Sequence, residues 1–292
     1  MSHFDSPEFL KGMGGKFRPT PPIDMTKASI SRVYSYLLGG KDHFAVDRAM
    51  ADYAEDAVPG VTDLALGNRA FVQRAVRFLA SERGIRQFLD IGSGLPSDGN
   101  VHEIAHESAR DARVVYVDND PIVLAHARAL LADDHTTIVV TADLTDPADI
   151  LAKAEGSGLI DLARPVGLIL GGILHHLHDH QDPGGLTARL RDSLVPGSHI
   201  AVSHFLRPPA EEHPTDHEHA VKLEEAFLAK LSTGVWRPHE DIRGYFGDWT
   251  MFDPGVVPLN EWRPTPGSAA RGSYLMPERN QRLIAGGVAH KE

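Results

Sequence analysis

The spacing of apolar residues divides the chain into a helical N-terminal part and a longer part in which short apolar runs alternate with helical segments. Before residue 86 the pattern predicts three helices, over 29–38, 43–57 and 64–83. In the third, apolar side chains recur every three or four positions, as in Phe71, Ala75 and Phe78. Residues 1–28 are rich in Gly and Pro and mix both charges, so they are predicted to form a flexible arm.

From residue 86 onward, apolar runs of strand length alternate with amphipathic segments of helix length. Predicted strands cover 87–91, 113–117, 137–141, 166–170 and 198–205, and predicted helices between them cover 100–108, 121–132, 147–154 and 183–194. Three of these helices begin with Asp followed by Pro, at Asp120, Asp146 and Asp182, which suits an N-cap followed by the first helical position. Such alternation predicts parallel strands joined by right-handed crossovers.

The pattern changes again after residue 205. Thr215 and Glu218 have the spacing of a capping box for a helix that reaches Leu231, and a short helix is predicted between Pro238 and Gly247. Two late strands are predicted over 249–257 and 282–289. The expected fold is therefore α/β, a Rossmann-like doubly wound sheet of seven mostly parallel strands with an N-terminal helical extension. The expected units are the arm (1–28), a helical cap or lid (29–85) and a sheet domain (86–292).

Composition narrows the classes of function. Asp and Glu outnumber Lys and Arg by 40 to 29, for a net charge of −11, which disfavours binding to nucleic acid. The absence of cysteine excludes disulfides, thiolate zinc sites, iron–sulfur clusters and cysteine nucleophiles. No apolar run is long enough to span a membrane, and the N-terminus lacks an apolar leader. We therefore expect a cytoplasmic protein that does not bind membranes; the sequence does not indicate its oligomeric state.

A glycine turn at the end of the first predicted strand is the strongest local motif. It reads Asp90-Ile91-Gly92-Ser93-Gly94, and the glycines would let the backbone approach a ligand closely. Ser97 occupies the position of the third glycine in a dinucleotide fingerprint, and Asp90 would repel a pyrophosphate. The acidic group suits a ligand with an amino or sulfonium group instead. A tight strand-to-helix turn without a ligand is the alternative.

Acidic residues also follow the second and third strands. Asp118 and Asn119 end the second strand, where a carboxylate can accept hydrogen bonds from ribose hydroxyls. Asp143 and Leu144 end the third, where the carboxylate could accept from an adenine amino group. Taken alone, each of these acidic residues could be an ordinary turn residue. Together with Asp90 they place three acids at the sheet edge where doubly wound folds bind ligands.

At this point the sequence resembles the class I methyltransferases that use S-adenosylmethionine. The resemblance implies that Gly92 and Gly94 accommodate the methionine part of the cofactor, with Asp118 at the ribose and Asp143 at the adenine. A closer resemblance, to an actinobacterial S-adenosyl methyltransferase family long labelled as of unknown function, spans nearly the whole chain. The stretches that carry it are 32–44 (RVYSYLLGGKDHF), 68–71 (NRAF), 94–96 (GLP), 117–121 (VDNDP), 256–259 (VVPL) and 262–264 (WRP).

The break Gly39-Gly40-Lys41-Asp42 between the first two helices has two interpretations. By composition it is a polar interhelical turn with solvated charges. The resemblance favours a lid over the cofactor, with Lys41 or Arg69 near the cofactor carboxylate. Arg69 lies in a predicted helix and could equally be a surface charge.

Histidines follow the fourth strand, in the run His175-His176-Leu177-His178-Asp179-His180. Class I methyltransferases often place a similar stretch beside the active site, so His175 and His176 are the candidate catalytic residues. A neutral imidazole could take a proton from a hydroxyl or amine nucleophile. A zinc site is the alternative, but adjacent side chains point in different directions, so no metal is expected.

These motifs predict an S-adenosylmethionine-dependent methyltransferase that acts on a small-molecule acceptor by in-line displacement, with S-adenosyl-L-methionine as cofactor. An NAD(P)-dependent oxidoreductase shares the first two motifs. A non-catalytic S-adenosylmethionine-binding protein is the other alternative, since methyl transfer requires no obligatory catalytic group.

Overall fold

The computed structural model describes residues 24–130, 135–265 and 271–292, and within them eight strands form one sheet. Their order is β3-β2-β1-β4-β5-β8-β6, and β7 also pairs with β8. The bounds are β1 Gln87–Ile91, β2 Arg113–Asp118, β3 Thr137–Thr141, β4 Gly167–Gly171, β5 His199–Phe205, β6 Thr250–Met251, β7 Val257–Pro258 and β8 Ile284–His290. Strands β1 to β5 pair in parallel, and β8 runs antiparallel to β5. The predicted α/β fold with a mostly parallel sheet is confirmed.

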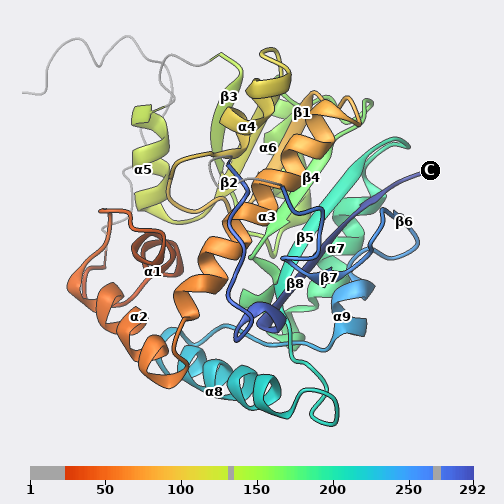
Figure 1. Cartoon of the computed structure of the whole chain (residues 1–292). Coiled ribbons are helices and arrows are strands. Elements are labelled where there is room, and N and C mark those ends of the chain that lie inside the picture. The colour runs from red at the N-terminus through yellow and green to blue at the C-terminus, as the bar shows by residue number, and fades with distance from the viewer. Residues whose placement is uncertain (1–23, 131–134, 266–270) are drawn as a thin grey trace, which may run out of the picture.

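Helices cover both faces of this sheet (Figure 1). Their bounds are α1 Ile30–Leu37, α2 Ala45–Ala57, α3 Val61–Ser81, α4 Val101–Ser108, α5 Pro121–Leu130, α6 Pro147–Gly156, α7 Pro183–Asp192, α8 Pro214–Leu231 and α9 His239–Gly244. The Asp-Pro starts act as predicted where α6 and α7 begin. Asp146 accepts from the N–H of Asp149 at 3.1 Å, and Asp182 accepts from that of Gly185 at 3.0 Å.

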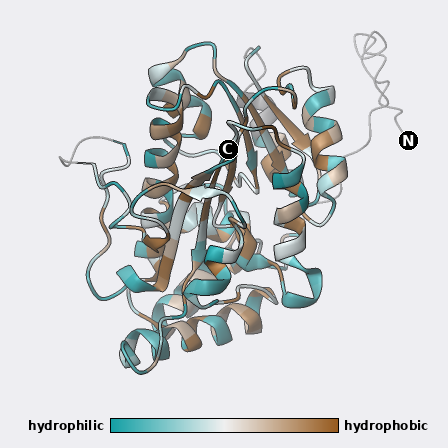
Figure 2. Cartoon of the chain, turned by 90° about the vertical axis from the view of Figure 1, so that its right-hand side faces the viewer, coloured by the Kyte–Doolittle hydropathy of each residue, from teal (hydrophilic) through white to brown (hydrophobic). Residues whose placement is uncertain are grey.

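Alternate residues of the strands build a hydrophobic core on each face, because successive side chains of a strand point to opposite sides. Phe88 belongs to the hydrophobic cluster that includes residues of α3, α4 and α8, whereas its neighbour Leu89 belongs to the cluster that includes residues of α6, α7 and α9. Figure 2 shows these apolar strands between helices whose outer surfaces are polar. Helix α3 packs against β4, β5 and β8, so its core is continuous with that of the sheet. The division at residue 85 stays a prediction, and most of the predicted arm, residues 1–23, lies outside the described residues.

Three local predictions need correction. The strand expected over 249–257 is two short strands, β6 and β7, which makes eight strands instead of seven. A turn at Pro254 and Gly255, closed by the Gly255 N–H to the Phe252 carbonyl at 2.8 Å, interrupts it. The capping box at Thr215 is wrong, because α8 already begins at Pro214 and the N-cap residue, His213, makes no side-chain capping bond. Helix α3 begins three residues before the predicted position, at Val61.

Candidate functional site

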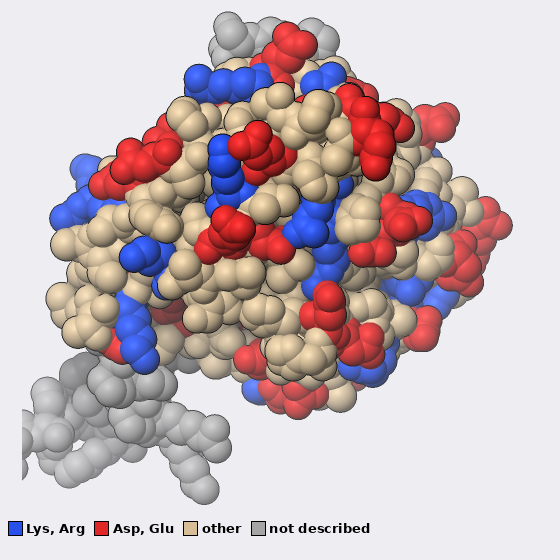
Figure 3. All heavy atoms as spheres, turned by 90° about the horizontal axis from the view of Figure 1, so that it is seen from below, with Lys and Arg blue, Asp and Glu red and all other residues tan. Residues whose placement is uncertain are grey.

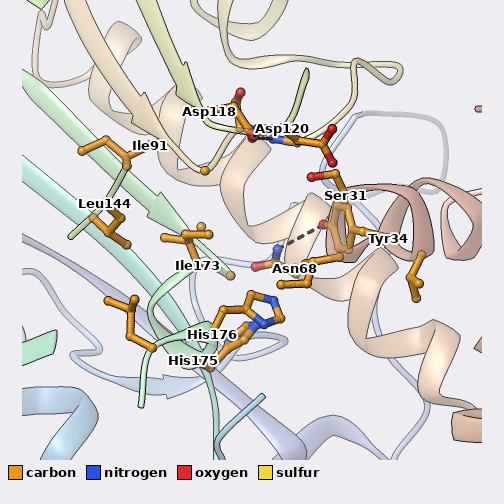
Figure 4. A pocket seen from close by; sticks show the side chains of 18 of the residues that line it. Ser31, Tyr34, Asn68, Ile91, Asp118, Asp120, Leu144, Ile173, His175 and His176 are labelled. Atoms are coloured by element: carbon orange, nitrogen blue, oxygen red, sulfur yellow. Dashed lines mark hydrogen bonds between the residues drawn. The ribbon is translucent and has the colours of Figure 1, made fainter. Parts of the chain in front are cut away.

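A cavity of about 500 Å³ opens at the carboxyl ends of β1 to β4. Residues from α1, α3 and α8 close its other side, so sheet and helices both contribute to the walls (Figure 4). All but one of the predicted site residues line it: Arg69, Asp90, Gly92, Ser93, Gly94, Asp118, Asn119, Asp143, Leu144, His175 and His176. The remaining one, Lys41, is exposed on the turn after α1 and is not among the lining residues.

The glycine turn wraps around the end of β2. Gly92 and Gly94 adopt φ values of +73° and +66°, a region that favours glycine. The N–H of Gly92 donates to the Val117 carbonyl at 2.8 Å, and that of Gly94 donates to Oδ2 of Asp118 at 2.9 Å. A Cβ on Gly92 would collide with the side chain of Ile173, which also lines the cavity. The absence of a side chain at Gly92 therefore leaves room for Ile173 at this edge of the cavity.

Two buried carboxyl groups lie beside this turn. Asp90 is 8% exposed and receives no hydrogen bond from any described residue, so burial raises its pKa to about 7, even though Arg69 acts to lower it. Asp118 is similarly buried, and burial raises its pKa too. Its oxygens accept from the N–H groups of Gly94 and Asp120, each at 2.9 Å. Asp118 is thus fixed by the backbone, whereas Asp90 has an unpaired carboxyl group at the cavity.

The tips of β2 and β3 are joined by a side-chain hydrogen bond. Asn119 donates from Nδ2 to Oδ2 of Asp143 at 2.9 Å. Burial acts to raise the pKa of Asp143, but hydrogen bonds from Thr145 and Asn119 outweigh it and hold the pKa below its ordinary value. Leu144 adds a buried apolar surface beside this carboxylate. This corner can accept hydrogen bonds from a planar polar group that rests on an apolar side chain.

Arg69 lines the cavity from α3, and its guanidinium holds the turn that follows the glycine motif. It donates to the carbonyl of Asp98 at 3.2 Å and to Oδ1 of Asn100 at 2.9 Å. The predicted lid, by contrast, is a compact turn here, in which the N–H of Gly40 bonds to the Ser35 carbonyl at 2.8 Å. A lid role for this turn stays a prediction.

The two candidate histidines, His175 and His176, form part of the cavity wall that follows β4. They lie in a short 3₁₀ turn after β4, with ring centroids 4.4 Å apart. Burial lowers the pKa of His176 to about 3 and that of His175 well below its ordinary value, so both rings are neutral at physiological pH. His204 is fully buried against Arg237 at 3.0 Å and does not line the cavity. Among the described residues, no three His, Cys, Asp or Glu side chains are grouped as a metal site requires.

Several lining residues were not identified as site residues from the sequence. Asn68 on α3 donates to the Tyr34 hydroxyl at 3.0 Å and accepts from the Ser203 hydroxyl, which joins α1, α3 and β5 (Figure 4). The Ser29 hydroxyl donates to Oδ2 of Asp120 at 2.7 Å and so ties the start of α1 to the tip of β2. Asn68 lies one turn before Phe71 on the buried face of α3. A polar residue at a position of the apolar pattern is the signal from which it could have been identified as a site residue.

Comparison with known proteins agrees with this geometry. A family model described as S-adenosyl methyltransferase matches residues 17–292. The chain is similar to the crystal structure of a candidate methyltransferase from Thermobifida fusca YX, with 42% identity, a TM-score of 0.82 and coverage of 94% of this chain and 98% of that one. It is also similar to a DUF574 family protein from Streptomyces avermitilis MA-4680, with 36% identity, a TM-score of 0.83 and coverage of 93% and 100%. No curated protein matches the chain.

The family match covers nearly the whole chain, and the predicted resemblance is confirmed. It rules against the nicotinamide-dependent oxidoreductase that the glycine turn alone left open. The chain belongs to the S-adenosyl methyltransferase family, and it is an S-adenosylmethionine-dependent methyltransferase.

Proposed function

We propose that this enzyme methylates a small, uncharged molecule by in-line displacement within the cavity. The observation that carries the proposal is the division of the cavity into a charged end and an apolar end. The charged residues that line it in the described chain, Arg69, Asp90, Asp118, Asp120 and Asp143, belong to the strand tips or to the α3 side chain bonded beside them.

The residues at the charged end suit S-adenosylmethionine. Its ammonium group and hydroxyls are hydrogen-bond donors, and this end offers carboxylates as acceptors. Asp118 would accept from the ribose, Asp143 and Leu144 would hold the adenine, and the unpaired carboxyl group of Asp90 would face the amino group. Arg69 would lie near the carboxylate. When bound, the cofactor supplies an electrophilic methyl group.

The other end of the cavity suits the acceptor. Its walls are apolar side chains from α1, α3, β5 and α8: Val33, Leu37, Val61, Leu64, Phe205, Phe227 and Leu231. The neighbouring polar groups are neutral, because His175 and His176 are uncharged at physiological pH. An ionised acceptor would lose hydration here without gaining a partner charge. The molecular surface seen from below in Figure 3, the side of α2 and α8, mixes both charges without a broad region of one sign.

His176 is the proposed general base. Its neutral ring would take the proton of an acceptor hydroxyl as the new bond to carbon forms, because that bond makes the proton strongly acidic, and the proton would leave to solvent after release of the product. A neutral amine acceptor could be methylated without a base. The helices and the histidine turn would orient the acceptor and exclude water, which is the main contribution that an enzyme makes to such a displacement.

The test is methyl transfer from isotope-labelled S-adenosylmethionine to a panel of uncharged aromatic and alicyclic alcohols and amines, each paired with a carboxylated counterpart. Leu231→Glu places a charge at the apolar end, and Leu228→Glu is the matched control, since Leu228 is exposed on the same helix. We expect Leu231→Glu to abolish turnover while the Kd for S-adenosylhomocysteine stays unchanged. Preference for carboxylated acceptors, or transfer to proteins or nucleic acids only, would overturn the proposal. Good cofactor binding without transfer to any member of the panel would count against a small, uncharged acceptor.

A further inference from the structure

The segment that follows α8 is bonded to the histidine turn along its length. The N–H of Val235 donates to the His175 carbonyl at 2.8 Å, and the Thr233 hydroxyl donates to the His176 carbonyl at 2.7 Å. The Nε2 atom of His178 lies 2.9 Å from the Ser232 carbonyl. This segment therefore fixes the main chain on which the two cavity histidines stand.

The second contact of Thr233 determines where His176 carries its proton. Its Oγ1 atom lies 3.4 Å from Nδ1 of His176. Because the hydroxyl proton already points to the His176 carbonyl, Oγ1 can act toward Nδ1 only as an acceptor. Nδ1 must then carry the hydrogen, and a neutral imidazole has only one. The lone pair is left on Nε2, which no described residue contacts by a hydrogen bond.

His175 has the opposite arrangement. Its Nδ1 atom accepts a hydrogen bond from the backbone N–H of Phe205 at 3.3 Å, and a backbone N–H can only donate. The hydrogen of the neutral ring is therefore on Nε2. Stacking on Phe205, with centroids 3.6 Å apart and planes 12° from parallel, prevents the ring from turning. Phe205 in turn stacks on Trp236, which is buried.

We infer that Thr233 is a positioning residue that holds His176 as the Nδ1-protonated tautomer, so that Nε2 of His176 is the base and Nε2–H of His175 is a donor. The inference rests on the proposed role of His176 in proton transfer. The two rings lie side by side on the cavity wall below Asn68 (Figure 4). One imidazole would receive the acceptor proton while the other donates a hydrogen bond to the same polar group. Thr233 itself need not touch the acceptor.

The arrangement also explains why two neighbouring histidines are not interchangeable. When Nε2 of His176 takes the proton, its Nδ1–H remains bonded to Thr233, and the cation that forms keeps a hydrogen-bond acceptor. In His175 the only atom that could accept a proton without breaking the bond to Phe205 already carries one. His176→Gln and His175→Gln are therefore expected to differ, with the larger loss of kcat in the first.

The direct test measures the tautomers by long-range ¹H–¹⁵N NMR on the full chain labelled with ¹⁵N-histidine, without any ligand. His175→Gln and His176→Gln assign the two signals. We expect Nδ1–H for His176 and Nε2–H for His175. Thr233→Val should move His176 to the Nε2–H form, and Thr233→Ser should restore Nδ1–H. Thr187→Val is the matched control, because Thr187 is buried and its hydroxyl bonds to the Pro183 carbonyl within α7, away from the cavity.

Kinetics with an acceptor found in the panel give a second readout. Thr233→Val should lower kcat about tenfold, the scale of one lost hydrogen bond, with Ser restoring it and the Kd for S-adenosylhomocysteine unchanged. Nε2–H on His176 in the unmodified protein would overturn the inference whether or not Thr233→Val folds. Spectra that a folded Thr233→Val variant leaves unchanged would also overturn it. Failure to find any acceptor would instead count against the proposed function and would not alter the NMR result.

Discussion

The unpaired Asp90 carboxyl group should make the free enzyme less stable at high pH. Asp90 is buried at the end of β1, near the buried Asp118, and its pKa is raised from 3.8 to about 7, chiefly by loss of hydration. That difference corresponds to about 4 kcal/mol, taken as an upper value. Because the folded pKa lies above the unfolded one, the folded state binds the extra proton. The destabilisation is therefore absent below about pH 4, grows as the pH rises, and is complete above about pH 7.

Asp90→Asn removes the ionisation and nearly preserves the shape. We expect the variant to unfold at a higher urea concentration than the unmodified protein at pH 8, with the difference shrinking as the pH falls toward 5. Asp111→Asn is the control, since Asp111 is an exposed carboxylate before β2, at the opposite edge of the sheet. Urea unfolding of the three proteins without cofactor, at several pH values, gives the comparison. A stability difference that does not vary between pH 5 and pH 8 would refute the raised pKa.

The same carboxylate should have the opposite effect on ligand binding. If Asp90 faces the amino group of the cofactor, Asp90→Asn removes a charged hydrogen bond of about 1.5–3 kcal/mol, and the Kd for S-adenosylhomocysteine at pH 8 should rise at least tenfold. Protonation should also weaken binding to the unmodified protein as the pH falls below about 7. Calorimetry across this range tests both expectations. An unchanged Kd would reject the ligand role of Asp90 and leave the stability argument intact.

Three further predictions follow from the geometry. Asp118→Ala should weaken S-adenosylhomocysteine binding by about 1–3 kcal/mol in calorimetry, and an unchanged Kd would reject the ribose assignment. Arg32→Ala should lower the free energy of unfolding by about 3–5 kcal/mol in guanidinium titrations, because it leaves the buried Asp47 carboxylate without its partner at 2.8 Å; a loss below 1 kcal/mol would contradict this. The pH profile of kcat at saturating S-adenosylmethionine, where protonation of Asp90 no longer limits cofactor binding, should lack a limb near pH 6.5, because burial lowers the pKa of His176 to about 3; protonation of His176 would reduce kcat only as the pH approaches that value.

The five parallel strands and their parallel direction could be predicted, because local sequence determines where strands and helices alternate. Apolar runs such as 166–170 are buried on both faces, and the helices between them enforce parallel pairing. The glycine turn and the acids at the tips of β2 and β3 could also be placed together, since carboxyl ends of neighbouring parallel strands meet at one edge. The N-caps Asp146 and Asp182 were also predicted correctly, because each bonds to a residue only three positions further along the chain.

Features that depend on distant contacts could not be predicted. The run 249–257 contains enough apolar residues for one strand, but only β6, near its start, and β7, which begins at its end, pair with β8, and a turn at Pro254 separates them. Whether Lys41 or Arg69 reaches the cavity depends on how α1 and α3 pack, and the sequence contains no local signal for that. Arg69 lines the cavity because α3 lies across the sheet, whereas Lys41 follows a turn that ends in solvent.

Buried polar residues near the acceptor side of the cavity are features that a single sequence can reveal. Asn68, Ser203 and His175 are buried polar residues that each have apolar residues close by in the chain. A buried polar side chain is costly unless it is hydrogen-bonded, so such residues persist where their partners are fixed by the fold. Asn68 meets Ser203 from a segment 135 residues away, and His175 meets Phe205 across 30 residues. Asn68 and His175 interrupt the local hydrophobic pattern and line the cavity, and Ser203 donates a hydrogen bond to Asn68, as expected when local rules are violated for function. Polar positions on otherwise apolar faces are therefore the residues from which the acceptor side could have been predicted, although the partner of each one becomes known only from the fold.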